Sequence, residues 1–479
     1  MQGENFYLMN RRDFIRSATV AAAGVLLGNP GRAAGAGFSV VRRPAGQRKF
    51  SSAAVEKTIR RVQGSLDNRE LGWMFENCFP NTLDTTVNFA LLNGQPDTYV
   101  ITGDIDAMWL RDSSAQVWPY LPLMAEDPAL QQLIAGVINR QTRCILKDSY
   151  ANAFYRDEHQ ISQWQGDRTE MKPGVHERKW EIDSLCFPVR LAYGYWKTTG
   201  DSTPFNPAWQ QAVRRILETF REQQRKHGPG PYRFQRNTEV ATDTLAGGGY
   251  GRPARPVGLI CSMFRPSDDA TVFPYLVPSN FFAVASLRQA AEMVEQIQRD
   301  TDLAAQCRGL ADEVERALQR YAVVTHEKFG RIYAYEVDAF GNAYCIDDGN
   351  VPSLLSLPYL SAVKPDDEIY LNTRRFVLSD NDPYYCQGRA ASGPGGPHAG
   401  IGMIWPLGLT VQGLTSNDDD EIRRCLDTLR RTHAGTGFMH EAFDQDDPNR
   451  FTRPWFAWAN TMFGEFILKV LAERPRLLT

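Results

Sequence analysis

From residue 53 to its final residues, the chain repeats one pattern, with apolar side chains at positions i, i+3, i+4 and i+7. This spacing gathers the apolar side chains on one face of an α-helix, and that face must be buried against a neighbour. The pattern predicts an all-α protein. The segments that carry it are 53–66, 128–146, 180–200, 207–226, 278–298, 302–321, 420–433 and 455–473.

Long irregular segments, rich in Gly, Pro, aromatic and charged residues, separate these helices; they include 245–258, 391–406 and 437–460. Loops of this length inside a compact domain are usually functional. Short strands are expected over 98–105 and, as a hairpin with an Asp-x-x-Gly turn, over 331–345. No change of composition marks a second domain. We expect a single helical barrel, with paired helices in inner and outer rings.

The first 37 residues have the character of an export signal. Arg11 and Arg12 precede a weakly apolar run over 18–27, and small residues follow around 34–36. This order resembles a twin-arginine signal, and the run is too short and too rich in Ala and Gly to span a bilayer permanently. We expect a signal peptide over 1–37, a flexible basic tether over 38–52 and one domain over 53–479, exported to the periplasm or the extracellular space.

Charge and cysteine spacing exclude several classes of protein. The net charge of −3 gives no case for a nucleic-acid surface or a polybasic membrane patch. The 8 Cys include no C-x-x-C pair and the 7 His no H-E-x-x-H, so we predict no metal site and no cofactor. Twin-arginine substrates fold before export in a reducing compartment, and we therefore expect most of these thiols to be buried.

Four segments place carboxylates beside Trp, Arg and small residues. Carboxylates and Arg are rarely buried unless they are paired or functional, so their recurrence beside aromatic rings indicates a polar pocket. The residues are Asp104, Asp106, Trp109, Arg111 and Asp112; His176, Glu177, Trp180, Glu181 and Asp183; Asp268 and Asp269; and His440, Glu441, Asp444, Arg453, Trp455, Trp458 and Asn460.

This combination favours glycosidic bond cleavage. That reaction needs one protonated carboxylic acid for the leaving oxygen and one carboxylate that attacks the sugar or activates water. The pair Asp268-Asp269 lies in apolar surroundings, and both desolvation and a like-charged neighbour raise the pKa of a carboxyl. Neighbouring side chains of an extended segment point to opposite faces, so we expect only one of the two to face the site.

The motifs GDIDAMWLRDSSAQVWPY, WEIDSLCFP, FRPSDDATVFPYLVPSNFFAV and GFMHEAFDQDDPNRFTRPWFAWANTMFGE resemble those of glycoside hydrolase family 125, the exo-α-1,6-mannosidases. The resemblance runs over 68–471. It implies an (α/α)6 barrel with long irregular loops and a few short β-hairpins. It also implies a metal-independent enzyme that removes terminal non-reducing α-1,6-linked mannose with inversion.

The resemblance also implies roles for single residues. The general acid falls on Asp268, with Asp269 as its competitor, and the general base falls on Glu441. Inversion needs the two carboxyls roughly 6.5–9.5 Å apart, so that a water fits between the base and the anomeric carbon. As substrate-binding residues we expect Asp104, Trp109, Arg111, Asp112, His440, Arg453 and Trp455.

Structural roles are open for several of these residues. Arg111 and Asp112 could cap a helix that begins at Ser113, and Arg453 could mark the start of the last helix, with Pro in its first turn. Trp455 could belong to the core, and His440 could be a structural hydrogen-bond partner.

Three other functions fit part of the pattern: an inverting glucoamylase- or trehalase-like glycosidase acting on another sugar, a sugar epimerase, and a non-catalytic glycan-binding protein. An epimerase needs pairs of His, and the 7 scattered His make this less attractive. A glycan-binding protein would not need both acids. The expected partner is a mannose-containing oligosaccharide bound by a monomer, with no nucleic acid and no stable membrane insertion.

Overall fold

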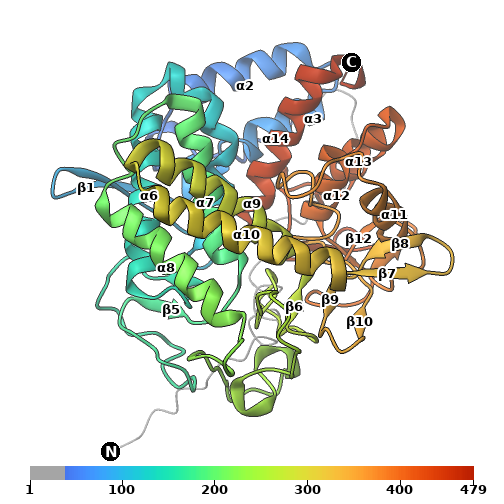
Figure 1. Ribbon diagram of the computed structural model, residues 1–479. Coiled ribbons are helices and arrows are strands. Elements are labelled where there is room, and N and C mark those ends of the chain that lie inside the picture. Colours follow the sequence, from blue (N-terminus) through green and yellow to red (C-terminus); the bar gives the residue numbers. More distant parts are fainter. Residues whose placement is uncertain (1–37, 479) are drawn as a thin grey trace, which may run out of the picture.

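The one-sided segments form helices in the computed structural model, which describes residues 38–478 (Figure 1). The predicted signal peptide, 1–37, lies outside the described residues. The helices are α2 (Ala53–Ser65), α3 (Arg69–Cys78), α4 (Asn81–Thr85), α5 (Leu110–Val117), α6 (Pro128–Lys147), α7 (Asp183–Thr199), α8 (Pro207–Gln223), α9 (Val277–Met293), α10 (Thr301–Tyr321), α11 (Glu368–Val377), α12 (Pro406–Leu414), α13 (Asp419–Arg431) and α14 (Ala457–Glu473).

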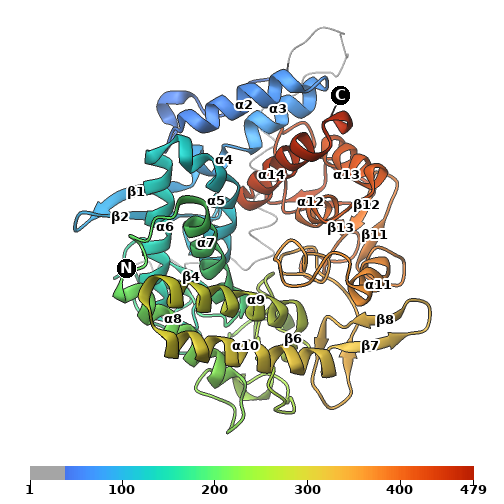
Figure 2. The same cartoon turned by 45° about the horizontal axis from the view of Figure 1, so that its top comes forward.

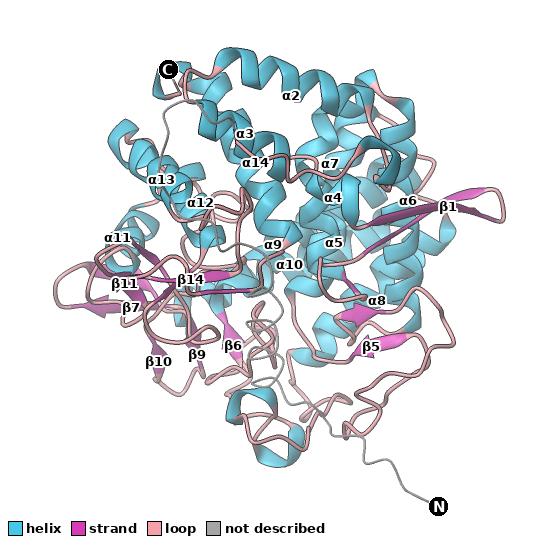
Figure 3. Ribbon diagram, turned by 180° about the vertical axis from the view of Figure 1, so that it is seen from behind, coloured by secondary structure: helices cyan, strands magenta, loops and turns pink. Residues whose placement is uncertain are grey.

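Short antiparallel strands connect these helices (Figure 3). Three sheets have two strands: β1 (Val87–Leu92) pairs with β2 (Gln95–Val100), β7 (Val323–His326) with β8 (Gly330–Tyr333), and β11 (Tyr385–Gln387) with β12 (Ser392–Pro394). Three sheets have three strands. Their orders are β3 (Met108–Trp109), β4 (Ala153–Phe154), β5 (Val175–Glu177); β10 (Ala343–Tyr344), β9 (Glu336–Val337), β6 (Tyr275–Leu276); and β13 (Met403–Ile404), β14 (Ala442–Asp444), β15 (Phe451–Thr452).

The helices form an inner and an outer layer around a common axis (Figure 2). Helices α12, α14, α5, α7 and α9 are buried over most of their length and contact one another in that order. Helices α2, α8, α10, α11 and α13 bury one face and expose the other, whereas α6 is exposed only near its start. The last helix, α14, packs against α3, α4 and α5 and so closes the ring. The predicted all-α class with (α/α)6-barrel architecture is confirmed.

One position of the inner layer is irregular. Inner and outer helices alternate along the chain, so an inner helix is expected between α10 and α11. The chain there forms a turn-rich segment, and residues 346–357 within it are buried throughout. Its last turn is held from two sides: the Tyr359 hydroxyl donates to Glu465 of α14 over 2.9 Å, and the guanidinium of Arg190 of α7 stacks on the Tyr359 ring.

The three-stranded sheets lie at the N-terminal ends of inner helices. Strand β3 leads directly into α5, β6 into α9 and β13 into α12, and β15 precedes α14 by a few residues. Because inner helices alternate with outer ones, they run in the same direction, and their N-terminal ends meet at one end of the barrel. The four acid-rich segments predicted from the sequence all reach this end.

Most helix predictions match the structure, and the exceptions have physical causes. The segment 180–200 becomes helical only at Asp183, and 278–298 ends in one π-helical turn, Val294–Gln298. Five of the described helices were not predicted. Helices α5 and α12 are buried on all sides and show no one-sided pattern, and α3, α4 and α11 are short, with 10, 5 and 10 residues. The hairpin expected within 331–345 is formed by β9 and β10, with Asp338 capping its turn.

The segment expected to be a tether, 38–52, contacts the domain. Arg42 is buried and binds Asp84 over 2.7 Å and Glu56 over 2.6 Å. The expectation for the thiols is confirmed, since seven of the 8 Cys are buried and Cys345 is partly exposed. Within residues 38–478, no helix combines the length and the apolar character needed to cross a bilayer.

The contact between α14 and the end of α3 predicts a stability effect. A Cβ at Gly464 of α14 would lie 2.6 Å from Cδ2 of Phe79, which is fully buried. We expect Gly464→Ala to lower the free energy of unfolding by about 1–3 kcal/mol, because the core must shift to admit the methyl group. Denaturant unfolding followed by circular dichroism measures this.

Gly309 of α10 provides the matched control, because a Cβ there would meet nothing within 4 Å. An exposed helical Gly replaced by Ala gains about 0.5–1 kcal/mol of stability. We therefore expect Gly309→Ala to unfold at higher denaturant concentration than the parent chain. Equal effects of the two substitutions would contradict the described packing.

Candidate active site

Helix α5 begins with two of the predicted site residues. Trp109 ends β3 in an extended conformation, and the helix starts at Leu110, so Arg111 and Asp112 lie in its first turn. The alternative in which Arg111 and Asp112 cap a helix that begins at Ser113 is therefore wrong, because both residues lie inside the helix. Both side chains are buried, with 4% of Arg111 and 7% of Asp112 exposed.

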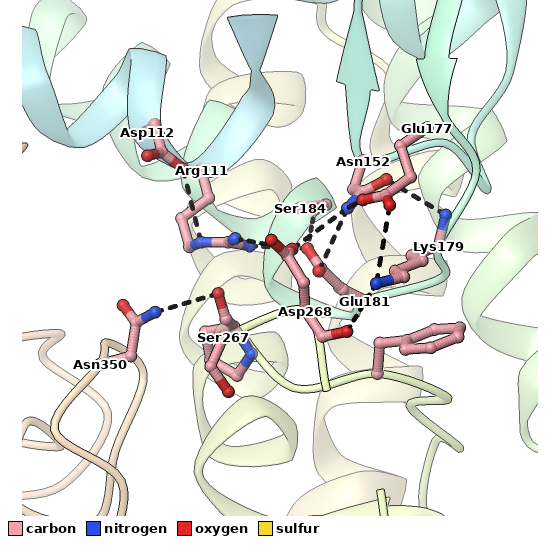
Figure 4. Close-up of polar contacts among 12 residues, drawn as sticks. Arg111, Asp112, Asn152, Glu177, Lys179, Glu181, Ser184, Ser267, Asp268 and Asn350 are labelled. Atoms are coloured by element: carbon pink, nitrogen blue, oxygen red, sulfur yellow. Dashed lines mark hydrogen bonds and ion pairs between the residues drawn. The ribbon is translucent and has the colours of Figure 1, made fainter. Parts of the chain in front are cut away.

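Arg111 is shared by four carboxyl groups, three of which, Asp112, Glu181 and Asp268, are labelled in Figure 4. Its Nη1 lies 2.6 Å from Glu181 Oε2 and 3.2 Å from Asp183 Oδ2, at the start of α7. Its Nη2 lies 3.4 Å from Asp268 Oδ1, and its Nε lies 3.6 Å from Asp112 Oδ2. One cation therefore joins the N-terminal ends of α5 and α7 to the loop that carries Asp268.

The loop around Asp268 is a tight turn rather than the extended segment expected from the sequence. Phe264 and Ala270 form an isolated antiparallel bridge, and the Asp268 N–H donates to the Arg265 carbonyl over 2.9 Å. Asp268 has φ of 67°, in the left-handed region that non-Gly residues rarely occupy. The Lys179 ammonium donates to the Asp268 carbonyl over 2.9 Å and holds this conformation.

The turn sends the two adjacent carboxyls in different directions. Asp268 lies 3.4 Å from Asn152 Nδ2 and keeps 22% of its side chain exposed. Asp269 is 4% exposed and lies 3.3 Å from His398 Nδ1. The expectation that the two acids point apart therefore holds, but the cause is the turn and not strand alternation.

Burial controls the protonation of the acids around Arg111. Burial raises the pKa of Glu181 well above its usual range, with Arg111 opposing and Asp268 and Asp183 adding to the effect. Burial likewise raises the pKa of Asp183 to about 6, against the pull of Arg111. For Asp112, burial raises the pKa, Arg111 and Arg453 lower it, and Asp268 raises it further.

A second ionic group surrounds Glu441. Thr452 of β15 donates to Glu441 Oε2 over 3.1 Å, and Arg453 Nη1 donates to Oε1 over 3.3 Å. The same guanidinium binds Asp104 through Nη2 over 2.5 Å. All three charged side chains remain partly exposed, at 13% for Glu441, 19% for Arg453 and 23% for Asp104.

The backbone brings this second group to the same end of the barrel as the first. Gly103, beside Asp104, forms an antiparallel bridge with Phe456, and the Ala457 N–H donates to the Thr102 carbonyl over 3.2 Å. Burial is the largest cause of the raised pKa of Asp112; Asp268 raises it further and Arg453 lowers it. Both groups therefore lie near enough to Asp112 for their charges to act on it.

The aromatic residues and His440 contribute differently. Trp109 is 6% exposed, packs edge-on against His176 at 5.2 Å, and its indole N–H has no hydrogen-bond partner in the described part of the chain. Trp455 is partly exposed, and its indole N–H donates to Asn81 over 3.0 Å. His440 is 1% exposed and stacks on Phe451 with ring centroids 3.7 Å apart, and burial lowers its pKa to about 4.

The structure also places residues at the site that sequence reasoning did not assign to it. Glu181 and Asp183 belong to an acid-rich segment that the sequence singled out, but no role was derived for them. Asn152 and Lys179 carried no signal, since nothing local indicates that they meet Asp268. Lys179 is 1% exposed and is also bound to Asp243 over 2.6 Å.

Two further observations concern possible metal ligands and a second hollow. No three His, Cys, Asp or Glu side chains within residues 38–478 are grouped so that they could hold a metal ion. A hollow of about 610 Å³ lies elsewhere, on the outer side between α8 and α10, and none of the site residues described in this subsection lines it.

The fold is that of helical-barrel glycosidases. A bacterial glucoamylase solved with acarbose is 14% identical with a TM-score of 0.51, over 88% of this chain and 59% of that one. The glucoamylase of Saccharomycopsis fibuligera is 11% identical with a TM-score of 0.50, over 91% of this chain and 99% of that one. At such identities the likeness shows the fold alone.

Residues 68–468 match the model of the metal-independent α-mannosidases, GH125, and the chain belongs to this family of glycoside hydrolases. A Streptococcus pneumoniae family structure, a non-productive complex with α-1,6-mannobiose, is 43% identical with a TM-score of 0.86, over 89% of this chain and 100% of that one. The meiotically up-regulated gene 157 protein of Schizosaccharomyces pombe is 44% identical over 456 residues, 91% of this chain and 89% of the relative.

Proposed function

We propose that this α-mannosidase removes terminal, non-reducing α-1,6-linked mannose from oligosaccharides with inversion of the anomeric centre. One observation carries the proposal. Two partly exposed carboxyls, Asp268 and Glu441, lie at one end of the barrel, the first beside an arginine shared by four carboxyls and the second beside an arginine shared by two. The relative of known structure that binds α-1,6-mannobiose supports this choice of linkage.

Asp268 is proposed as the general acid. Its carboxyl is bound by Arg111 and Asn152, and it lies among more carboxyls than the one guanidinium can neutralise. In the reaction, the bond between the anomeric carbon and the leaving oxygen breaks with its electron pair on that oxygen. The oxygen takes the proton of Asp268, and Arg111 stabilises the carboxylate that remains.

Glu441 is proposed as the general base. Arg453 and the Thr452 hydroxyl both donate to its carboxylate and hold it in place. Water held by Glu441 attacks the anomeric carbon from the face opposite the leaving oxygen and gives one proton to the carboxylate. Asp104, bound to the same Arg453, remains exposed enough to accept hydrogen bonds from sugar hydroxyls.

Linkage-defined mannobioses test the reaction. With α-1,6-mannobiose we expect β-mannose to appear first in the proton NMR spectrum, because attack opposite an α-linked leaving group inverts the centre. We expect the α-1,2 and α-1,3 isomers to react at least about tenfold more slowly, and activity to survive EDTA. First appearance of α-mannose contradicts inversion, and equal rates on the isomers contradict the proposed linkage.

Single substitutions distinguish the roles of the two carboxyls. We expect Asp268→Asn to lower kcat/KM on α-1,6-mannobiose by on the order of 10²–10⁴-fold and to retain more activity on an aryl mannoside, whose leaving group needs little protonation. We expect Glu441→Gln to lose activity on both substrates. Asp269→Asn is the control, because its carboxyl points to His398. A larger loss in this control would move the acid to Asp269.

We further propose that the chain is exported through the pattern around Arg11 and Arg12. In a bacterial host with a twin-arginine pathway, we expect the chain to collect in the periplasm as a shortened form. Replacing both residues, Arg11→Lys and Arg12→Lys, should retain it in the cytoplasm. Unchanged distribution after cell fractionation would contradict this route.

A further inference from the structure

Glu181 and Asp268 share their binding partners. The amide nitrogen of Asn152 lies 3.3 Å from Glu181 Oε1 and 3.4 Å from Asp268 Oδ1. The guanidinium of Arg111 lies 2.6 Å from Glu181 and 3.4 Å from Asp268. Two donors therefore hold the two carboxyls side by side, as Figure 4 shows.

Charge balance requires that this group of carboxyls retains protons. Arg111 carries one positive charge, and the four carboxyls that it contacts would together carry four negative charges if all were ionised. Three of them are 7% exposed or less, and like charges in a buried site cannot all remain ionised. Some of these carboxyls must therefore be protonated.

Other charged or titratable groups also surround the pair. They are Asp112 of α5, Asp183 of α7, His176 and Glu177 of β5, Lys179, and Asp269 of the same loop.

Most of these groups have other partners or do not contact both Asn152 and Arg111. Glu177 is paired with Arg236 over 3.0 Å, and Lys179 is paired with Asp243 over 2.6 Å. Asp183 and Asp112 each contact Arg111 but have no hydrogen bond to Asn152 or Asp268. Glu181 is thus the carboxyl that shares both Arg111 and Asn152 with Asp268.

We propose that Glu181 is a positioning residue that shares one proton with Asp268 and thereby keeps the general acid protonated at neutral pH. This inference rests on the proposed function. Glu181 is completely enclosed, with 0% of its side chain exposed, whereas Asp268 is 22% exposed. Only Asp268 can therefore pass the shared proton to a leaving oxygen and regain one from solvent. The raised pKa of Glu181 agrees with this arrangement.

The pH profile of Glu181→Gln tests the proposal. Without the second carboxyl, Arg111 has Asp268 as a closer counter-ion, and the acid loses its proton at lower pH. We expect the alkaline limb of kcat/KM on α-1,6-mannobiose to move down by about one pH unit, with the acid limb unchanged. Hydrolysis of an aryl mannoside should lose much less activity at neutral pH, which a general packing defect would not produce.

Asp183→Asn is the matched control, because it removes a carboxyl from the same guanidinium without removing a partner of Asn152. We expect a clearly smaller shift of the alkaline limb. An equal shift would mean that total charge around Arg111 matters and that Glu181 has no particular role. An unchanged limb in Glu181→Gln would overturn the proposal directly.

Ser184→Ala decides the question if Glu181→Gln does not fold. The Ser184 hydroxyl donates to Glu181 Oε2 over 2.8 Å, and its loss shifts the shared proton towards Glu181. We expect a several-fold lower plateau of kcat/KM on α-1,6-mannobiose than on the aryl mannoside, and equal effects on both would overturn the proposal. Asp268→Asn distinguishes a failure of this proposal from a failure of the proposed function. If Asp268→Asn kept full activity on α-1,6-mannobiose, the assignment of Asp268 as the general acid would be wrong.

Discussion

Arg111 is the charge on which the acid side of this site depends. It lies in the first turn of α5 with 4% of its side chain exposed, and it is the shared partner of Glu181, Asp183, Asp268 and Asp112. Removing one partner of a buried ion pair is costly, because the other charge is left without compensation. Loss of this one guanidinium would leave four such groups. The contact that joins α5, α7 and the Asp268 loop therefore also determines which carboxyls carry protons.

The position of the site follows from the direction of the inner helices. Their N-terminal ends meet at one end of the barrel, where free backbone N–H groups and the helix dipole favour negative charge. Asp112 and Asp183 lie in the first turns of α5 and α7, and Glu441 lies shortly before α14. The opposite ends of these helices carry none of the residues assigned to the site. The fold thus gathers carboxyls where two of them can be brought together for catalysis.

The sequence predicted those parts that leave a local pattern. Outer helices such as α6 and α10 were found because one face is apolar, whereas α5 and α12 are buried all round and gave no such signal. The acid-rich segments were found because carboxylates recur in them beside aromatic rings, and they reach the end of the barrel where the inner helices begin. Asn152 and Lys179 could not be found in this way, because their contacts with Asp268 span 116 and 89 positions and arise only in the folded chain.

The two sides of the site differ in their balance of charge, and this difference fits the two proposed roles. Around Arg111 four carboxyls face one guanidinium, which favours retention of a proton on the acid side. Around Arg453 two carboxylates, Glu441 and Asp104, face one guanidinium, and the Thr452 hydroxyl adds a donor. On the base side, both carboxylates are therefore bound by the same cation. An inverting glycosidase needs one proton donor and one proton acceptor at the same pH. Unequal numbers of carboxyls around two arginines, one buried and one partly exposed, can provide both without a metal ion.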